Sequence, residues 1–118
     1  MADIHAQMRF LPISAQKVRL VINQVRGKDA VQALEVLRFI PTRAAEPVRK
    51  VVASAVANAE ENFGVSRDDL YLAMIYADEG PTRRWRRFGA RGRFKPIFRR
   101  SSHVTVILRE REHNRIRT

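Results

Sequence analysis

The stretch from Arg83 to Arg100 constrains the fold of this chain most, because it holds nine basic residues and no acidic one. Four of the nine aromatic residues also lie within it. Unpaired charges are costly to remove from water, so this stretch cannot belong to a hydrophobic core. The remaining 14 of the 23 basic residues are set against all 12 acidic residues. We therefore expect a nearly neutral body that carries one strongly cationic segment.

Two strand-like runs flank the cationic segment. Residues 70–77 are apolar at both alternating sets of positions, and residues 104–107 are β-branched, which favours strands. About 25 residues without helical periodicity lie between the two runs. A connection of this length in a compact domain is either disordered or functional. We predict that the two runs pair, and that the connection extends beyond the sheet as an antiparallel hairpin with its tip near residues 88–95.

Three stretches ahead of these strands have apolar residues at helical spacing. They begin or end at residues typical of helix termini: serine and glycine for 14–27, aspartate and proline for 29–41, and glycine at the end of 45–64. Asp29 and Gln32 are spaced to form a capping box on the second helix. The expected apolar stripes are Ala15, Val18, Ile22 and Val25, then Ala30, Ala33, Leu34 and Leu37, then Val48, Val52, Ala55, Val56, Ala59 and Phe63.

A further strand is expected over residues 5–13, where Ala6, Met8 and Phe10 share one face. The fold class is therefore α+β, with a small helical body and a long protruding hairpin. At 118 residues the chain fits one domain. We assign the body to 1–80 and 102–112, the extended hairpin to 81–101 and a frayed tail to 113–118.

The chain has no cysteine, which excludes disulfides and cysteine metal sites and leaves packing to stabilise the body. No segment has the apolar length of a membrane span, and the first ten residues resemble neither a secretory signal nor a transit peptide. We expect a soluble, unprocessed protein of a bacterial-type cytoplasm, or one made inside an organelle.

The cationic segment has the residue types of a nucleic-acid ligand. Arginine grips phosphate through two parallel hydrogen bonds and stacks on bases, and Trp85, Phe88 and Phe94 are suited to cover unstacked bases. A long thin prong fits a crevice in compact RNA better than duplex DNA. A second basic group on the first helix, Lys17, Arg19, Arg26 and Lys28, either grips phosphates from the body or forms an ordinary solvated flank.

Catalytic and metal sites are not expected. His5, His103 and His113 lack the spacing of metal ligands, and the Ser101-Ser102-His103 run lacks a glycine elbow and an orienting acid. The acid pairs Asp68-Asp69 and Asp78-Glu79 are adjacent, so on a strand their carboxylates point to opposite faces and cannot share a proton or metal. No phosphate-binding glycine loop is present. We predict no enzymatic activity, no cofactor and no metal.

Two other classes of protein share some of these features. The first two helices and the intervening Gly27-Lys28 could form a helix-turn-helix of a DNA-binding protein, but the charge lies mainly on another element. A cationic membrane-active segment is the other class, but residues 83–100 lack helical periodicity and are interrupted by glycine and proline.

Several ordered motifs resemble one known family. They are SAQKVRLV at 14–21, RGK at 26–28, SAVANA at 54–59, DEGP at 78–81, RGR at 91–93 and SHVTV at 102–106. The chain resembles the bacterial-type ribosomal protein L22 family of the large subunit from about residue 6 to residue 109. The resemblance implies three helices on a three-stranded antiparallel sheet, and a hairpin that runs through large-subunit (23S-type) rRNA to the wall of the polypeptide exit tunnel.

The resemblance also implies partners and residues. Its partners are large-subunit rRNA, neighbouring large-subunit ribosomal proteins and the nascent polypeptide that passes the hairpin tip; we expect neither a membrane nor a homo-oligomer. Among the expected rRNA-binding residues, the resemblance implies Lys17, Arg19, Arg26, Lys28, Arg83, Arg84, Arg99 and Arg100, and the chemistry of the cationic segment adds Trp85, Arg86, Arg87, Phe88, Arg91, Arg93 and Lys95. The expected tunnel-facing tip consists of Gly89, Ala90, Arg91, Gly92 and Arg93.

Overall fold

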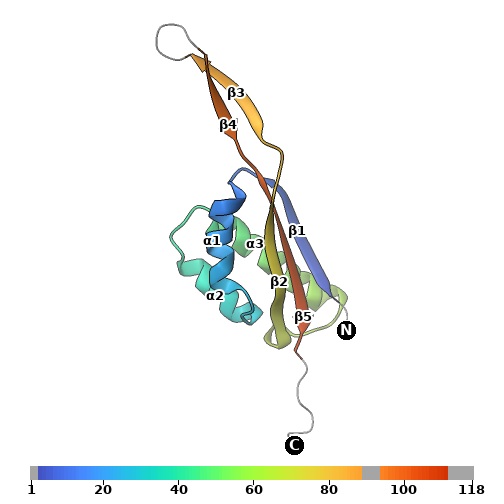
Figure 1. Ribbon diagram of the computed structural model, residues 1–118. Coiled ribbons are helices and arrows are strands. Elements are labelled where there is room, and N and C mark those ends of the chain that lie inside the picture. The colour runs from blue at the N-terminus through green and yellow to red at the C-terminus, as the bar shows by residue number, and fades with distance from the viewer. Residues whose placement is uncertain (1–2, 89–93, 112–118) are drawn as a thin grey trace, which may run out of the picture.

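Three helices cover one face of a three-stranded sheet, and a two-stranded ribbon continues beyond the sheet (Figure 1). This computed structural model describes residues 3–88 and 94–111, and for 83–88 and 94–98 it describes the backbone. The helical elements are α1 (Ala15–Val25), α2 (Ala30–Phe39), α3 (Ala45–Asn62) and the short 3₁₀ helix η1 (Arg67–Asp69). The strands are β1 (Ile4–Leu11), β2 (Leu70–Glu79), β3 (Arg83–Phe88), β4 (Phe94–Arg99) and β5 (Ser102–Glu110). The α+β class predicted from the sequence is confirmed.

The body sheet has the order β1-β5-β2, with both neighbours antiparallel to the central β5. The predicted pairing of the runs at 70–77 and 104–107 is confirmed, since Ile75 lies opposite Val106 and Ala77 opposite Val104. All four of these residues are buried, because they face the helices. The helices bury their predicted stripes against this face, with Val18, Val52 and other members fully inaccessible. Packing of one sheet face on three helices therefore makes the core.

The helix boundaries follow the sequence signals closely. Gly27 has a φ of 78°, the left-handed conformation that ends a helix at a glycine with little cost. α2 ends at Phe39, two residues before Pro41. α3 begins at Ala45, as predicted from the disturbance that Pro47 imposes on the first turn. Local sequence thus sets where the helices begin and end.

Two predicted apolar positions are wrong. Phe10 does not share a face with Ala6 and Met8, because the register of β1 shifts between Met8 and Leu11. Phe10 there has a φ of 57° and is 62% exposed, while Leu11 is buried. Phe63 is 48% exposed, since α3 ends at Asn62 and the helical stripe does not continue.

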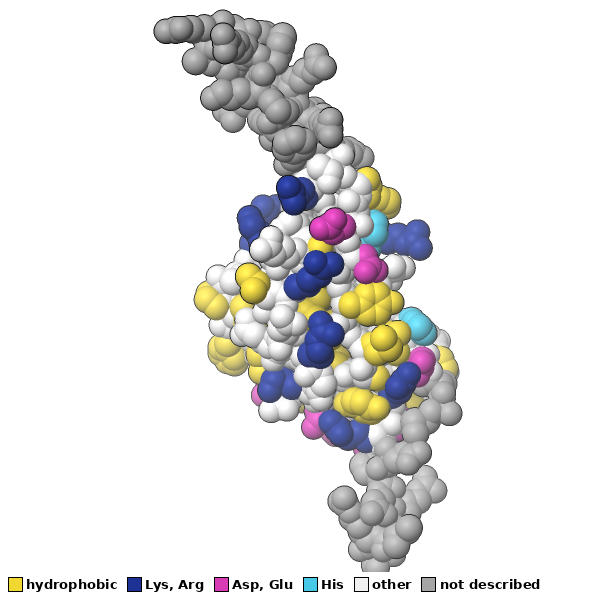
Figure 2. Space-filling model, in the orientation of Figure 1, with side chains coloured by type: hydrophobic (Ala, Val, Ile, Leu, Met, Phe, Trp, Pro, Cys, Tyr) yellow, Lys and Arg dark blue, Asp and Glu magenta, His cyan; other side chains and the backbone are white. Residues whose placement is uncertain are grey.

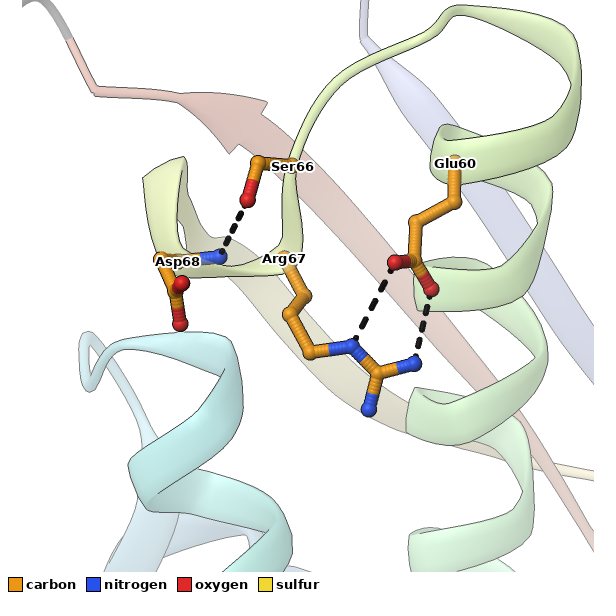
Figure 3. A network of polar contacts seen from close by, with 4 residues as sticks. All are labelled: Glu60, Ser66, Arg67 and Asp68. Carbon is orange, nitrogen blue, oxygen red and sulfur yellow. Dashed lines mark hydrogen bonds and ion pairs between the residues drawn. The ribbon is translucent and has the colours of Figure 1, made fainter.

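Two predicted polar features also differ. Asp29 lies at the N-cap position of α2 but its side chain makes no capping hydrogen bond; its carboxylate instead accepts from Arg111 Nε at 2.5 Å. Asp68 and Asp69 lie in η1 rather than on a strand. η1 is fixed by local contacts: Ser66 Oγ accepts from the Asp68 N–H, and Arg67 Nη2 donates to Glu60 of α3 at 2.8 Å (Figure 3). These contacts tie the turn before β2 to α3.

Candidate nucleic-acid interface

The β3–β4 ribbon holds the most basic part of the chain. Its backbone forms an antiparallel ladder from Arg83 opposite Arg99 to Phe88 opposite Phe94. The same register sets Arg87 opposite Lys95. Like charges directly opposite each other destabilise an antiparallel pair, and an isolated two-stranded ribbon is marginally stable in water. The ribbon therefore combines a regular backbone with a charge pattern that an anionic partner would neutralise.

The predicted residues of the hairpin fall into three groups. Arg99 and Arg100 are exposed at the base of the ribbon. Arg83, Arg84, Trp85, Arg86, Arg87, Phe88 and Lys95 lie on the described backbone of β3 and β4. The predicted tip residues Gly89, Ala90, Arg91, Gly92 and Arg93 lie outside the described residues, as does the tail predicted at 113–118.

Several contacts tie the base of the ribbon to the body. The Gly80 N–H donates to the Ser101 carbonyl at 2.9 Å, and Ser101 Oγ donates to the Pro81 carbonyl at 2.8 Å. The Phe10 N–H donates to His103 Nδ1 at 3.0 Å, and the two rings meet edge to face with centroids 5.0 Å apart. A Cβ added at Gly80 would lie 2.5 Å from Ser101 Oγ and 3.3 Å from the His103 ring. We call these five residues the joint.

The joint was not predicted from the sequence. The signals were present, since Gly80 precedes a proline and His103 lies in a strand-like run, but neither signal says which distant residue completes the contact. Phe10 in particular reaches His103 only because the β1 register shift turns its backbone out of the ladder. At Gly80 the backbone lies close to Ser101 and His103, so the strands that lead into the ribbon have little room to shift against each other.

A second basic surface lies on α1. Between residues 4 and 28 the sequence has five basic residues and no acidic one. Lys17, Arg19 and Arg26 are exposed, and Lys28 is half-buried. Arg19 also has a structural contact that the sequence did not predict: its Nε and Nη2 donate to the Ala77 carbonyl of β2 at 3.2 and 2.9 Å. This contact fixes the guanidinium at the edge of the sheet.

The turn between α1 and α2 lies along the same edge of β2, nearer the start of the strand. The Leu72 N–H donates to the Lys28 carbonyl at 2.9 Å, and Asp29 forms an isolated bridge with Tyr71. Arg26 Nη2 donates to Asn23 within α1 at 3.4 Å. Arg19 is therefore held beside β2 by its contact with Ala77, and the backbone at Lys28 lies along the same strand. Figure 2 shows Lys and Arg side chains spread over one face of the body, from just below the ribbon to the opposite end.

Two arginines at the end of the body away from the ribbon have acidic partners. Arg109 Nε donates to Asp3 at 2.6 Å, and this hydrogen bond holds the pKa of the Asp3 carboxyl below its usual value. Arg111 bonds Asp29 and lies over the Tyr71 ring, 4.7 Å from its centroid. These two arginines form ion pairs within the body.

The described part of the chain has neither a metal-binding group of residues nor a membrane-spanning helix. Among those residues no group of three histidines, cysteines or acids is placed to hold a metal ion. No helix within them is both long and apolar enough to cross a membrane.

The comparison with protein families is decisive. The family model for ribosomal protein L22p/L17e matches residues 6–109, which is most of the chain. The chain belongs to the ribosomal protein L22p/L17e family. This confirms the resemblance found in the sequence motifs, and it identifies the chain as a ribosomal protein rather than an enzyme.

Curated relatives agree with this membership. The chain is 48% identical over 113 residues to large ribosomal subunit protein uL22 of Cutibacterium acnes, covering 96% of this chain and 74% of that protein. It is 47% identical over 110 residues to uL22 of a Thermoanaerobacter strain, covering 93% of this chain and 99% of that protein. Against uL22 of a Synechococcus strain it is 48% identical over 107 residues, covering 91% and 87%. The similarity to the L22p/L17e family thus extends through body and ribbon.

Proposed function

We propose that this chain is a structural constituent of the large ribosomal subunit, where it binds large-subunit rRNA and supports assembly. It acts in the ribosome, in a bacterial-type cytoplasm. The observation that carries the proposal is the register of the ribbon, which sets Arg83 against Arg99 and Arg87 against Lys95 on a backbone ladder that extends beyond the helices (Figure 1). Folded rRNA supplies phosphates on all sides of such a ribbon, so binding removes the repulsion that destabilises the free ladder.

The ribbon and α1 bind rRNA in different ways. The ribbon enters a crevice, where arginines pair with phosphates while Trp85 and Phe88 cover bases or sugars. On α1, the Ala77 carbonyl holds Arg19 in place, so its remaining N–H groups are oriented before RNA arrives. We assign rRNA binding to Lys17, Arg19, Arg26, Lys28, Arg83, Arg84, Trp85, Arg86, Arg87, Phe88, Arg91, Arg93, Lys95, Arg99 and Arg100.

The tip has a separate role. We assign residues 89–93 to the wall of the polypeptide exit tunnel, where Gly89, Ala90 and Gly92 offer little side-chain bulk to a passing nascent chain. Membership of the L22p/L17e family supports this assignment. Within the single domain, 1–80 and 102–112 fold as the body and 81–101 form the extended hairpin.

Gradient sedimentation of native lysate tests the main proposal. The protein should migrate with the large subunit, RNase should abolish that migration, and DNase should leave it unchanged. Migration that survives RNase but is lost with DNase would instead support a DNA-binding helix-turn-helix protein.

Shortening the hairpin tests the division between arms and tip. Deletion of 88–94 with closure by a short glycine turn removes only Arg91 and Arg93 among the charges and leaves every buried stripe intact. The shortened protein should enter subunits at near-normal yield, while ribosome profiling shows altered pausing on stalling sequences. Exclusion from subunits despite a native circular-dichroism spectrum would show that the tip is an assembly anchor.

A further inference from the structure

A groove lies between α2, α3 and η1, and it is lined by one face of α2, one face of α3 and Arg67 of η1. Its volume is about 460 Å³. The lining residues on α2 recur at helical spacing and so share one face, as do those on α3. The groove is lined by Val31, Leu34, Glu35, Arg38, Glu46, Arg49, Ala53 and Arg67.

Part of the groove lining is apolar and only half-buried. Val31, Leu34 and Ala53 lie in it, and each stays partly accessible to solvent. Phe39 follows Arg38 on α2, one helical turn beyond Glu35, and is 83% exposed. Among the described residues it is the most exposed of the large apolar side chains. The half-buried apolar residues of the lining and the exposed Phe39 together offer apolar surface to a partner.

Charges around the groove balance, unlike those of the surfaces assigned to rRNA. Arg49 pairs with Glu46, and Arg67 pairs with Glu60 at 2.8 Å (Figure 3). Glu35 and Arg38 make no ion pair within the part of the chain that the structure describes. Residues 30–69 contain six acidic and five basic residues, in a chain with a net charge of +11. The region around the groove therefore lacks the excess of positive charge that characterises α1 and the ribbon.

We propose that this groove docks a segment of a neighbouring protein, and not rRNA. The proposal rests on the function above, which places the chain in a ribosomal subunit. Glu35, Glu46 and Glu60, the partner of Arg67, balance the three arginines of the lining, so an RNA strand would bring its phosphates to a surface without net positive charge. A protein segment can place an apolar side chain over Leu34 and Ala53, with a basic group facing Glu35 and an acidic group facing Arg38. The charged groups of the partner would form ion pairs with Glu35 and Arg38.

Site-specific photo-crosslinking tests the kind of partner. Phe39→p-benzoylphenylalanine exchanges one exposed aromatic side chain for another, and Leu20→p-benzoylphenylalanine serves as the control on α1, where Leu20 is 66% exposed. Large subunits that contain each variant are purified and irradiated, and the adducts are sorted by RNase treatment and mass spectrometry. The Phe39 variant should give an RNase-resistant adduct with one ribosomal protein, through a peptide with an apolar residue between a basic and an acidic one.

The control separates this proposal from the proposed function. The Leu20 variant should give an adduct with rRNA. The absence of that adduct would count against rRNA binding by α1, but it would leave the docking proposal for the groove unaffected. An rRNA adduct at Phe39, no adduct at all, or a partner peptide with charges of one sign only would overturn the docking proposal.

A charge exchange at the groove tests the recognition itself. Glu35→Lys combined with Arg38→Glu leaves the net charge unchanged, so rRNA binding should persist. The yield of the Phe39 protein adduct should fall by at least about fivefold, because each unpaired charge now meets a like charge on the partner. The matched control is Lys50→Glu with Glu61→Lys, which exchanges two exposed charges of α3 outside the groove. Equal yields from the exchanged and control variants would contradict the proposed charge complementarity.

Discussion

The body sheet and the β3–β4 ribbon are both antiparallel, but different forces order them. In the body, opposite pairs such as Leu72 and Leu108 are fully buried under the helices. In the ribbon, Arg83 lies opposite Arg99, and no helix covers the ladder (Figure 1). The same hydrogen-bonding pattern is therefore stabilised by burial in one region and opposed by charge in the other. We therefore expect the body to fold by itself and the ribbon to gain its stability from bound rRNA.

Neutralising the ribbon should give the largest effect on binding. In the variant with Arg83, Arg84, Arg99 and Arg100 all changed to Gln, four cationic groups no longer release counterions from rRNA. The slope of log affinity against log salt should flatten by about 3, since each phosphate contact contributes about 0.7–0.9. Filter binding over a salt series measures the slope, and thermal melting should show an unchanged body. An unchanged slope would reject the assignment of these arginines.

Truncating the core should give the largest effect on stability. Leu72→Ala removes a fully buried side chain of β2 from the core, and should lower the free energy of unfolding by about 2–5 kcal/mol. Met74→Ala, two residues along β2 at a 47% exposed position, is the matched control and should cost under about 1 kcal/mol. Urea titration measures both. Similar losses from the two variants would mean that burial does not hold the body sheet.

Substitutions in the joint should have an intermediate effect on the stability of the body and on rRNA binding by the ribbon. Gly80→Ala places a Cβ 2.5 Å from Ser101 Oγ, and this overpacking should cost about 1–3 kcal/mol. Adding Ser101→Ala removes the closest atom, so the double variant should be more stable than the sum of the single changes predicts. Melting curves supply the double-mutant cycle, and rRNA affinity at fixed salt shows whether the ribbon is still presented. Simple additivity would show that Gly80 and Ser101 do not constrain each other.

The ion pair at the far end of the body should give the smallest effect. The hydrogen bond from Arg109 lowers the pKa of Asp3, so the stability from this pair is present above the ordinary carboxyl value of 3.8 and is lost as pH falls through the lowered value. Asp3→Asn should therefore melt slightly below wild type at pH 7, and the two should converge in acid. Glu61→Gln, on the exposed surface of α3, is the control. A difference that persists undiminished below pH 3 would exclude this origin.

Sequence patterns predicted the elements that burial and local caps determine. The stripes of α1 and α3 follow from spacing, and the ends at Gly27 and Ala45 follow from backbone chemistry. The pairing of β2 with β5 followed from the apolar run at 70–77 and the β-branched run at 104–107. Each of these features depends on residues close together in the sequence or on burial alone.

Features that depend on distant partners could not be predicted. Asp29 has the sequence of a capping box, but Arg111 is close enough in space to take its carboxylate. Phe10 leaves its expected face because the register of β1 shifts, and its N–H then bonds His103, which is 93 residues away in the sequence. Arg19 contacts a carbonyl of β2 that no helical spacing could indicate. Among the candidate rRNA-binding residues, composition indicated the charge, while the ladder register that sets like charges opposite emerged only from the structure.

Hydrogen exchange on the free and rRNA-bound protein tests the comparison most directly. In the free protein, backbone amides of the β2–β5 ladder should be strongly protected, and those of the β3–β4 ladder should exchange with little protection. Binding to large-subunit rRNA should leave the first group nearly unchanged and slow the second group markedly. If the β3–β4 amides were already as protected as those of β2–β5 in the free protein, the ribbon would be stable without its partner, which would contradict its ordering by rRNA.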